Sequence, residues 1–217
     1  MNNNQNQAIK GQLYIVSAPS GAGKTSLLTA LVNVLPDVCL SISNTTRKQR
    51  VGEINGQHYH FIDDKQFQEK IDAGDFLEYA QVFDYYYGTS LSALERQLSQ
   101  GKDVILEIDW QGAQQVRQQL PCYSLFILPP SLSTLEERLT KRKQDSKAII
   151  QRRMRDARAD MKHYNEFDYV LINDVFEIAC AQLESIFRAN RFRLSVQENQ
   201  HRELLLELTQ NPEQAFQ

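Results

Sequence analysis

The sequence contains few cysteines and no long apolar run. Its three cysteines are widely spaced and accompany neither a CxxC motif nor a paired histidine spacing. An odd count with that spacing predicts neither a disulfide framework nor a zinc site, so we expect buried or inert thiols at Cys39, Cys122 and Cys180. The apolar stretches, such as Val104–Ile108, are far shorter than the roughly 18 uninterrupted apolar residues of a membrane span, which excludes a membrane-spanning role.

The chain also carries little net charge. Among its 217 residues, 24 Lys and Arg oppose 27 Asp and Glu, a net charge of -3, and 41% of the residues are hydrophobic. Such a composition is typical of a globular chain that can bury a core, and the length suits one large domain or two small ones. The first ten residues are mostly polar amides and lack the apolar centre of a signal peptide, so we expect a disordered tail over 1–10 and a cytoplasmic protein.

The small net charge conceals an uneven distribution. Residues 136–163 hold ten Lys and Arg against five Asp and Glu, a net charge of +5, which leaves -8 for the rest of the chain. A basic helical segment can bind phosphates or nucleic acid, or it can be a solvated face without function. The overall acidity and the absence of a base-reading motif disfavour nucleic acid as a partner.

Apolar runs predict the order of the main elements. The run at Gln12–Ser17 is followed by a glycine-rich turn and by helical spacing over Thr25–Leu35, which predicts a strand, a loop and a helix. Three further runs, at Val104–Ile108, Tyr123–Leu128 and Asp168–Ile172, do not alternate with polar residues. Strands of that kind are covered on both faces, as in a parallel sheet, so the fold class is α/β.

Between these runs the pattern changes. Short β-prone pieces separated by turn signals occupy 37–100, and Asn55-Gly56 among them predicts a hairpin. The segment 133–164 is helical and strongly charged, and a last helix is expected over Val175–Arg193.

The most specific local feature is the stretch Ala18–Thr25, between the first predicted strand and helix. It matches the phosphate-binding P-loop G-x-x-x-x-G-K-[ST], except that Ala18 holds the first glycine position. Glycines let successive backbone N–H groups point inward, the helix N-terminus adds positive potential, and the lysine reaches the outer phosphates. We therefore predict a nucleoside triphosphate site at Ala18, Pro19, Ser20, Gly21, Ala22, Gly23, Lys24 and Thr25, with the Thr25 hydroxyl available to Mg²⁺.

A P-loop does not identify the second substrate, because NTPases, GTPases and small-molecule kinases share it. Arg47 and Arg50 lie three residues apart with hydroxyl residues just upstream. Two guanidinium groups backed by hydroxyl donors suit a phosphate monoester dianion. Taken alone, the stretch is better explained as a basic surface loop. The surrounding motifs, however, favour a phosphate-binding role for it.

Five further motifs follow in order. They are TTRxxRxGExNGxxY at 45–59, FxExA at 76–80, YYGT at 86–89, DWQG at 109–112 and Ile-Asn-Asp at 172–174. In this order and spacing, and together with the P-loop, they make the chain resemble the guanylate kinases over residues 11–190. The resemblance implies an enzyme of purine nucleotide metabolism that transfers the γ-phosphate of ATP to GMP, giving ADP and GDP.

The resemblance also implies a P-loop NTPase-like, three-layer fold with a parallel core sheet, a small mixed β/α insert that binds the nucleoside monophosphate, and a helical lid. The corresponding segments are the core 11–36, 101–132 and 165–190, the insert 37–100, the lid 133–164 and a helical or frayed tail 191–217.

Site residues follow from the matched positions only. The resemblance implies that the GMP phosphate is bound by Ser43, Arg47, Arg50, Tyr59 and Tyr87, and guanine by Glu78, Thr89 and Asp109. A carboxylate such as Glu78 can accept from guanine N1–H and the 2-amino group together, whereas adenine offers neither donor. On the donor side, the resemblance implies that Asn173 contacts adenine and that Thr25 binds Mg²⁺. The positions that match the family's catalytic cations are Lys24, Arg47, Arg138, Arg142 and Arg153.

Several alternatives remain open at this stage. Tyr79 stands where some family members have Trp and Glu107 where some have Asp, so Glu107 is either a strand-end carboxylate without function or a group near the metal or the base. Asp109 could serve guanine or the water shell of the metal. The chain could phosphorylate another acceptor such as a ribose phosphate, or be a non-catalytic protein-binding module. The apolar stretch Leu204–Leu208 fits either a homo-oligomer interface or packing back onto the domain.

Overall fold

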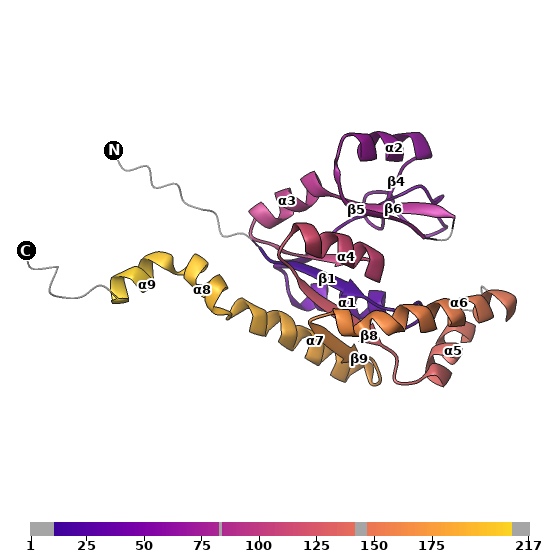
Figure 1. Ribbon diagram of the computed structural model, residues 1–217. Helices are drawn as coiled ribbons and strands as arrows, with labels where there is room; N and C mark the ends of the chain where they lie inside the picture. Colours follow the sequence, from indigo (N-terminus) through magenta and orange to yellow (C-terminus); the bar gives the residue numbers. More distant parts are fainter. Residues whose placement is uncertain (1–10, 83, 142–146, 210–217) are drawn as a thin grey trace, which may run out of the picture.

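The computed structural model describes residues 11–82, 84–141 and 147–209. The predicted amide-rich tail over 1–10 and the predicted lid residue Arg142 lie outside the described residues. The chain forms a core sheet flanked by helices, a smaller sheet at one end of the core, a helical segment beside the other edge, and a C-terminal helical extension (Figure 1).

The core sheet has five strands in the order β2-β7-β1-β8-β9. Every neighbouring pair is parallel, which confirms the expected α/β class. The strands are β1 (Leu13–Ser17), β2 (Val38–Leu40), β7 (Asp103–Glu107), β8 (Tyr123–Leu128) and β9 (Tyr169–Ile172).

Helices cover both faces of this sheet. Successive side chains of a strand point to opposite faces, and Ile15 and Val16 of β1 are both fully buried, in two different apolar clusters. The cluster around Val16 includes Leu28 of α1 (Lys24–Val34) and Phe187 of α7 (Phe176–Arg191). The cluster around Ile15 includes side chains of α3 (Leu91–Ser99) and α4 (Trp110–Gln119). Burial on both faces explains why β1, β7 and β8 are apolar with little alternation. The same expectation is wrong for the run Asp168–Ile172, because β9 is the edge strand and its Val170 and Ile172 are 44% and 48% exposed.

The smaller sheet has the order β4-β3-β6-β5 and is covered by α2. Phe67 of α2 is buried against the rings of Phe76 and Tyr86, with centroids 4.5 and 5.4 Å away. A capping box between Asp63 and Gln66 starts the helix. The elements are β3 (Asn44–Thr45), β4 (His60–Phe61), α2 (Asp64–Asp72), β5 (Phe76–Val82) and β6 (Tyr85–Ser90).

Two expectations about this region differ from the structure. The expected insert 37–100 is too long, because β2 pairs with β7 in the core sheet and Leu94 of α3 lies in a core cluster. The expected hairpin at Asn55-Gly56 is also wrong. Gly56 donates its N–H to the Tyr59 carbonyl at 2.8 Å in a turn, but the strand that follows, β4, pairs in parallel with β3.

Two helices and a 3-10 turn fill the predicted lid segment. They are α5 (Leu132–Lys141), α6 (Lys147–Asp160) and η1 (Met161–Glu166). Leu135 and Leu139 of α5 pack with Ala157 of α6 in a third small cluster. Their mutual burial holds the two helices together as one unit.

The C-terminal extension is helical through residue 209. It consists of α8 (Leu194–Gln200) and α9 (Arg202–Thr209), which continue beyond α7 away from the core sheet (Figure 1). Leu204, Leu206 and Leu208 are exposed, so they do not pack back onto the domain in this structure. Among the described helices, none is both long enough and apolar enough to cross a membrane.

Candidate active site

The predicted P-loop lies between β1 and α1 and depends on two glycines with positive φ. Gly21 and Gly23 both have φ of 93°, a conformation that residues with a Cβ rarely adopt. A Cβ on Gly23 would lie 2.4 Å from Nδ2 of Asn173, and one on Gly21 would lie 2.9 Å from Cδ1 of Leu135. Both glycines are therefore required by conformation and by space. Ala18, at the expected first glycine position, packs against the core cluster on the α1 side.

Two residues distant in sequence hold the loop backbone. The Asn173 side-chain amide donates to the carbonyl oxygen of Ala22 at 2.7 Å. Arg138 of α5 donates to the same oxygen at 3.4 Å and to the Asn173 carbonyl at 3.0 Å. Asn173 is buried, and its Oδ1 has no hydrogen-bond partner within the described part of the chain. The structure thus brings the predicted residues Asn173 and Arg138 to the loop, and it places Arg153 in α6.

A carboxylate faces the first residues of α1. Glu107 ends β7, beside Val16 of β1, because the carboxyl ends of parallel strands meet at one edge of the sheet. The Thr25 hydroxyl donates to Glu107 Oε1 at 2.7 Å, and Lys24 Nζ lies 4.0 Å from the same oxygen and 3.4 Å from the Ile108 carbonyl. Desolvation lowers the pKa of Lys24, and three nearby carboxylates oppose this effect: Glu107, Asp109 and Asp160. Glu107 therefore lies on the P-loop side, in contact with the first residues of α1.

Arg47 is held in the small sheet by several groups at once. Its side chain is 8% exposed and forms a two-pronged ion pair with Glu53, with N–O distances of 2.7 and 3.1 Å. The guanidinium carbon also lies 5.4 Å from the ring centre of Tyr59. The hydrogen bond to Glu53 is the main cause that raises the pKa of Arg47, and the Tyr87 hydroxyl adds to it. Arg47, Tyr59 and Tyr87 thus form one cationic and phenolic cluster.

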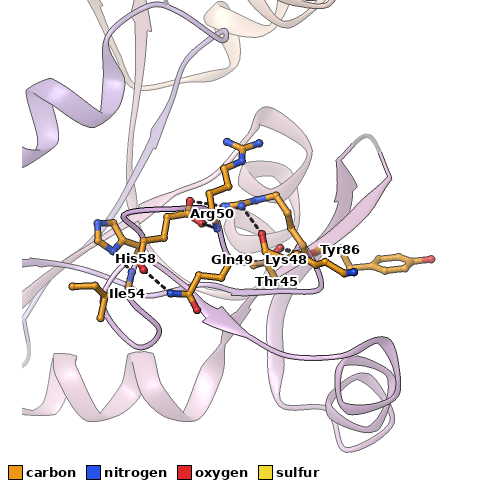
Figure 2. Close-up of polar contacts among 9 residues, drawn as sticks. Thr45, Lys48, Gln49, Arg50, Ile54, His58 and Tyr86 are labelled. Carbon is orange, nitrogen blue, oxygen red and sulfur yellow. Dashed lines mark hydrogen bonds and ion pairs between the residues drawn. The ribbon is translucent and has the colours of Figure 1, made fainter. Parts of the chain in front are cut away.

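Figure 2 shows the loop around this cluster. Gln49 donates to the Glu53 carbonyl, the backbone N–H of Ile54 donates to the ring of His58, and the Arg50 side chain extends away from the loop. Ser43, just before β3, accepts a backbone hydrogen bond from His60 at 2.9 Å. Of the predicted phosphate ligands, Arg47, Tyr59 and Tyr87 are brought together, and Arg50 and Ser43 make backbone hydrogen bonds in the same region.

A charge on the P-loop side acts on the Arg47 cluster. Burial raises the pKa of Tyr59, and the negative charge of Glu107 adds to that rise. Glu107 therefore lies near enough to Tyr59 to act on it, while it accepts a hydrogen bond from Thr25. Two arrangements suited to anions, the P-loop and the Arg47 cluster, are thus both near Glu107.

A buried carboxylate lies deeper in the small sheet. Glu78 of β5 is paired across strands with Thr89 of β6, and the Thr89 hydroxyl donates to Glu78 Oε1 at 2.6 Å. Glu78 is 4% exposed, and burial raises its pKa to about 7, with a smaller contribution from the charge of Asp109. Asp109 caps α4 by accepting from Gly112 N at 2.9 Å. The three residues predicted to read guanine therefore lie together.

Helix α4 makes close contact with β5 at this point. A Cβ on Gly112 would lie 2.8 Å from Oε2 of Glu78, so only glycine lets the helix come this near. Gln115 accepts from Tyr79 N at 3.2 Å and donates to Tyr79 O at 3.0 Å, and Gln119 donates to the Leu77 carbonyl at 2.7 Å. Sequence reasoning did not single out Gly112, Gln115 or Glu53, although Glu53 and Gly112 lie inside the quoted motifs TTRxxRxGExNGxxY and DWQG.

Comparisons with known proteins agree with this geometry. A family model described as guanylate kinase matches residues 10–190. The guanylate kinase of Alkalilimnicola ehrlichii is 57% identical over 189 residues, which cover 87% of this chain and 93% of that protein. The guanylate kinase of Haemophilus ducreyi is 54% identical over 201 residues, or 91% of this chain and 98% of that protein.

A solved structure extends the similarity to three dimensions. The crystal structure of guanylate kinase from Anaplasma phagocytophilum has a TM-score of 0.72 and 30% sequence identity, and the match covers 91% of this chain and 94% of that one. A family model over most of the chain, relatives of more than 50% identity and a shared fold all lead to one conclusion. The chain belongs to the guanylate kinase family.

Proposed function

We propose that this chain is an ATP:GMP phosphotransferase, which moves the γ-phosphoryl group of ATP to GMP and releases ADP and GDP. The observation that carries the proposal is the presence of two anion-binding arrangements near Glu107, with a buried carboxylate, Glu78, beyond the second. A donor triphosphate fits the first arrangement, an acceptor phosphate the second, and a base with two N–H donors fits Glu78.

The donor side uses the P-loop. Its inward N–H groups and the N-terminus of α1 suit the phosphates of ATP, and Lys24 suits the outermost of them. The unpaired, buried Oδ1 of Asn173 favours a contact with an amino group such as that of adenine. The proposed ATP-binding residues are Ala18, Pro19, Ser20, Gly21, Ala22, Gly23, Lys24, Thr25 and Asn173.

The residues present fit Mg²⁺ as cofactor. Mg²⁺ prefers oxygen ligands and is usually bound by one or two protein groups plus phosphates and water. Thr25 supplies a hydroxyl and Glu107 a carboxylate, and the two are already in contact at 2.7 Å. We propose that Thr25 would hold the ion, with Glu107 ordering its water shell. When bound, Mg²⁺ would neutralise charge on the donor phosphates.

The acceptor phosphate is proposed to bind at the Arg47 cluster. Arg47 and Arg50 would give charge-assisted hydrogen bonds to the GMP phosphate, and the phenols of Tyr59 and Tyr87 would donate to its remaining oxygens. Ser43 lies at the start of the same sheet and completes the proposed set.

Guanine would be read by Glu78 with Thr89 and Asp109. An ionised Glu78 accepts from N1–H and from the 2-amino group of guanine. Adenine would leave this buried acceptor unpaired, a mismatch that discriminates strongly. The carboxylate and its Thr89 partner favour GMP over ribose phosphates, which have no base at this position. They also favour a substrate-binding enzyme over a non-catalytic protein-binding module.

Chemistry then requires alignment and charge neutralisation more than activation of the nucleophile. Phosphoryl transfer has a loose transition state with charge spread over the equatorial oxygens. Lys24 and the lid arginines Arg138, Arg142 and Arg153 would neutralise that charge while Arg47 holds the acceptor in line. Arg138, which already contacts the P-loop carbonyl of Ala22, would act from α5.

The decisive experiment measures nucleotide products. The purified chain with Mg-ATP should convert GMP to GDP, and AMP, UMP and ribose 5-phosphate should be far poorer acceptors. Arg47→Ala should chiefly raise KM for GMP, and Lys24→Ala should impair the ATP side. Lys65→Ala, at an exposed position on α2, is a matched control and should behave as the wild type. No GDP formation would refute the enzyme and favour a protein-binding module, and equal use of all acceptors would refute the choice of GMP.

A further inference from the structure

We propose that Glu53 is a positioning residue for the acceptor phosphate. In this view its carboxylate holds one edge of the Arg47 guanidinium so that the other edge is presented to GMP. The inference rests on the proposed function, because it assigns a role within the same acceptor site.

The contacts of Arg47 leave a defined part of it available. Arg47 Nη1 donates to Glu53 and to the Lys48 carbonyl, the latter at 2.9 Å, and Nη2 donates to Glu53 at 2.7 Å. These contacts use three of the five N–H bonds that a guanidinium has. The Tyr87 hydroxyl is a further partner of the group. The two N–H bonds that Glu53 and Lys48 do not use, on Nε and Nη2, lie on the same side of the planar group. That side can form two parallel hydrogen bonds to a phosphate.

The same carboxylate also orders the second arginine of the motif. Glu53 Oε2 accepts from the backbone N–H of Arg50 at 2.7 Å, and the Glu53 N–H donates to the Arg50 carbonyl at 3.1 Å. The turn that carries Arg50 is thus closed on Glu53 from both sides. The loop drawn in Figure 2 is held further by Gln49, whose amide donates to the Glu53 carbonyl. One side chain therefore sets the position of both predicted phosphate-binding arginines.

Two opposite effects of Glu53 on GMP binding must be weighed. As an anion next to the acceptor site, Glu53 could compete with the phosphate for Arg47 and weaken binding. As a fixed partner, it removes the rotational freedom of a long side chain before GMP arrives. Its two oxygens are on the edge formed by Nη1 and Nη2, and not on the Nε edge. Since carboxylate and phosphate would use different edges, the positioning effect outweighs the competition.

Glu53 is ionised under the conditions in which the enzyme would work. The hydrogen bonds from Arg47 lower the pKa of its carboxyl, and the Arg50 N–H acts in the same direction. Glu53→Gln therefore removes a negative charge and one acceptor oxygen, and it changes the side-chain volume little.

The first test compares Glu53→Gln with the wild type in steady-state kinetics. We expect KM for GMP to rise at least tenfold, KM for ATP to change less than twofold, and the GMP dissociation constant from calorimetry to follow KM. Glu53→Asp keeps the charge with a shorter reach and should fall between the two. The matched control is Glu69→Gln, the same change at an exposed position on α2, which should leave all constants unchanged. An unchanged or lower KM for GMP in Glu53→Gln would overturn the proposal, because competition would then dominate.

The second test asks whether Glu53 acts through Arg47. In an Arg47→Ala background, Glu53→Gln should raise KM for GMP less than twofold further, because the group that it positions is gone. Full additivity of the two changes would refute positioning and indicate a general effect on the loop. If Glu53→Gln does not fold, Glu53→Asp carries both comparisons. Failure of the proposed function is seen separately, as absent GMP phosphorylation by the wild type or an unaltered KM for GMP in Arg47→Ala.

Discussion

Lowering the pH below 7 should weaken the use of GMP through a single buried carboxyl group. Glu78 is the proposed guanine-reading residue, and burial raises its pKa from 4.5 to about 7. Guanine presents two donors, so it needs the ionised carboxylate as acceptor. In the free protein the protonated form predominates below pH 7 and cannot accept at both oxygens. GMP binding should therefore improve as the pH rises through 7 and then level off.

The magnitude follows from the displacement of this pKa. At about 1.4 kcal/mol for each pKa unit, moving the pKa from 4.5 to about 7 corresponds to about 3 kcal/mol of lost solvation for the buried carboxylate. Below pH 7, kcat/KM for GMP should fall by up to about tenfold for each pH unit through this group alone. Because the folded protein binds this proton more tightly than the unfolded chain, stability should also decrease as the pH rises from about 4.5 to 7.

The assay measures kcat/KM for GMP between roughly pH 5.5 and 8.5, a range that brackets the titrations of Glu78 and of the GMP phosphate. The GMP phosphate itself titrates near pH 6, about one unit lower, so Glu78→Gln serves as the reference, because it keeps that titration and lacks the carboxyl. The ratio of kcat/KM for GMP in the wild type to that in Glu78→Gln, plotted against pH, should give a curve with its midpoint near pH 7. The variant should also unfold at higher urea concentration than the wild type at pH 8, and the difference should shrink towards pH 5.

Superimposable pH profiles for the wild type and Glu78→Gln would refute the reasoning. An increase of kcat/KM for GMP on acidification would refute it as well. The first result would mean that Glu78 does not contact guanine. The second would mean that its protonated form is the one that binds.

Three further predictions concern the P-loop and the core. Gly23→Ala puts a Cβ 2.4 Å from Asn173 at a φ of 93°, so ATP turnover should be lost while calorimetry still detects GMP binding; intact turnover would contradict this. Arg138→Ala should lower kcat by about 10²-fold in steady-state assays and leave KM for GMP unchanged, whereas Lys141→Ala on the same helix should leave both constants unchanged. Asp103→Asn weakens a 3.0 Å ion pair to Arg191 and should cost about 2 kcal/mol, the contribution of a hydrogen bond to a charged group, in urea unfolding without altering kinetics; a loss confined to activity would contradict that assignment.

The sequence was most informative where burial or chemistry left a continuous signature. The core strands β7 and β8 lie between two helical layers, so most of their positions are apolar and they could be predicted within one residue. The P-loop could be predicted because glycine and lysine positions follow from the geometry of phosphate binding. Glu78 needed the family resemblance, since an isolated carboxylate in a strand has no pattern of its own.

The remaining features depend on contacts between distant residues. β2 has three residues and β3 has two, too few for a periodic pattern, and both are held by partners more than 15 positions away. The turn at Asn55-Gly56 was identified, but its strand pairs in parallel with an earlier one, which a turn residue cannot reveal. Similarly, Glu53 resembles any exposed loop acid in the sequence, and its contacts with Arg47 and with the Arg50 N–H distinguish it.

The contact between α4 and β5 has a consequence for solubility. β5 is the last strand of the small sheet, so its outer N–H and C=O groups could recruit a strand from another molecule and start aggregation. Gln115 pairs with both backbone groups of Tyr79, and Gln119 pairs with the Leu77 carbonyl, so two side chains occupy positions that a foreign strand would take. Helix α4 therefore also protects the outer edge of the strand that carries Glu78. Replacing these glutamines by alanine would expose that edge to intermolecular pairing.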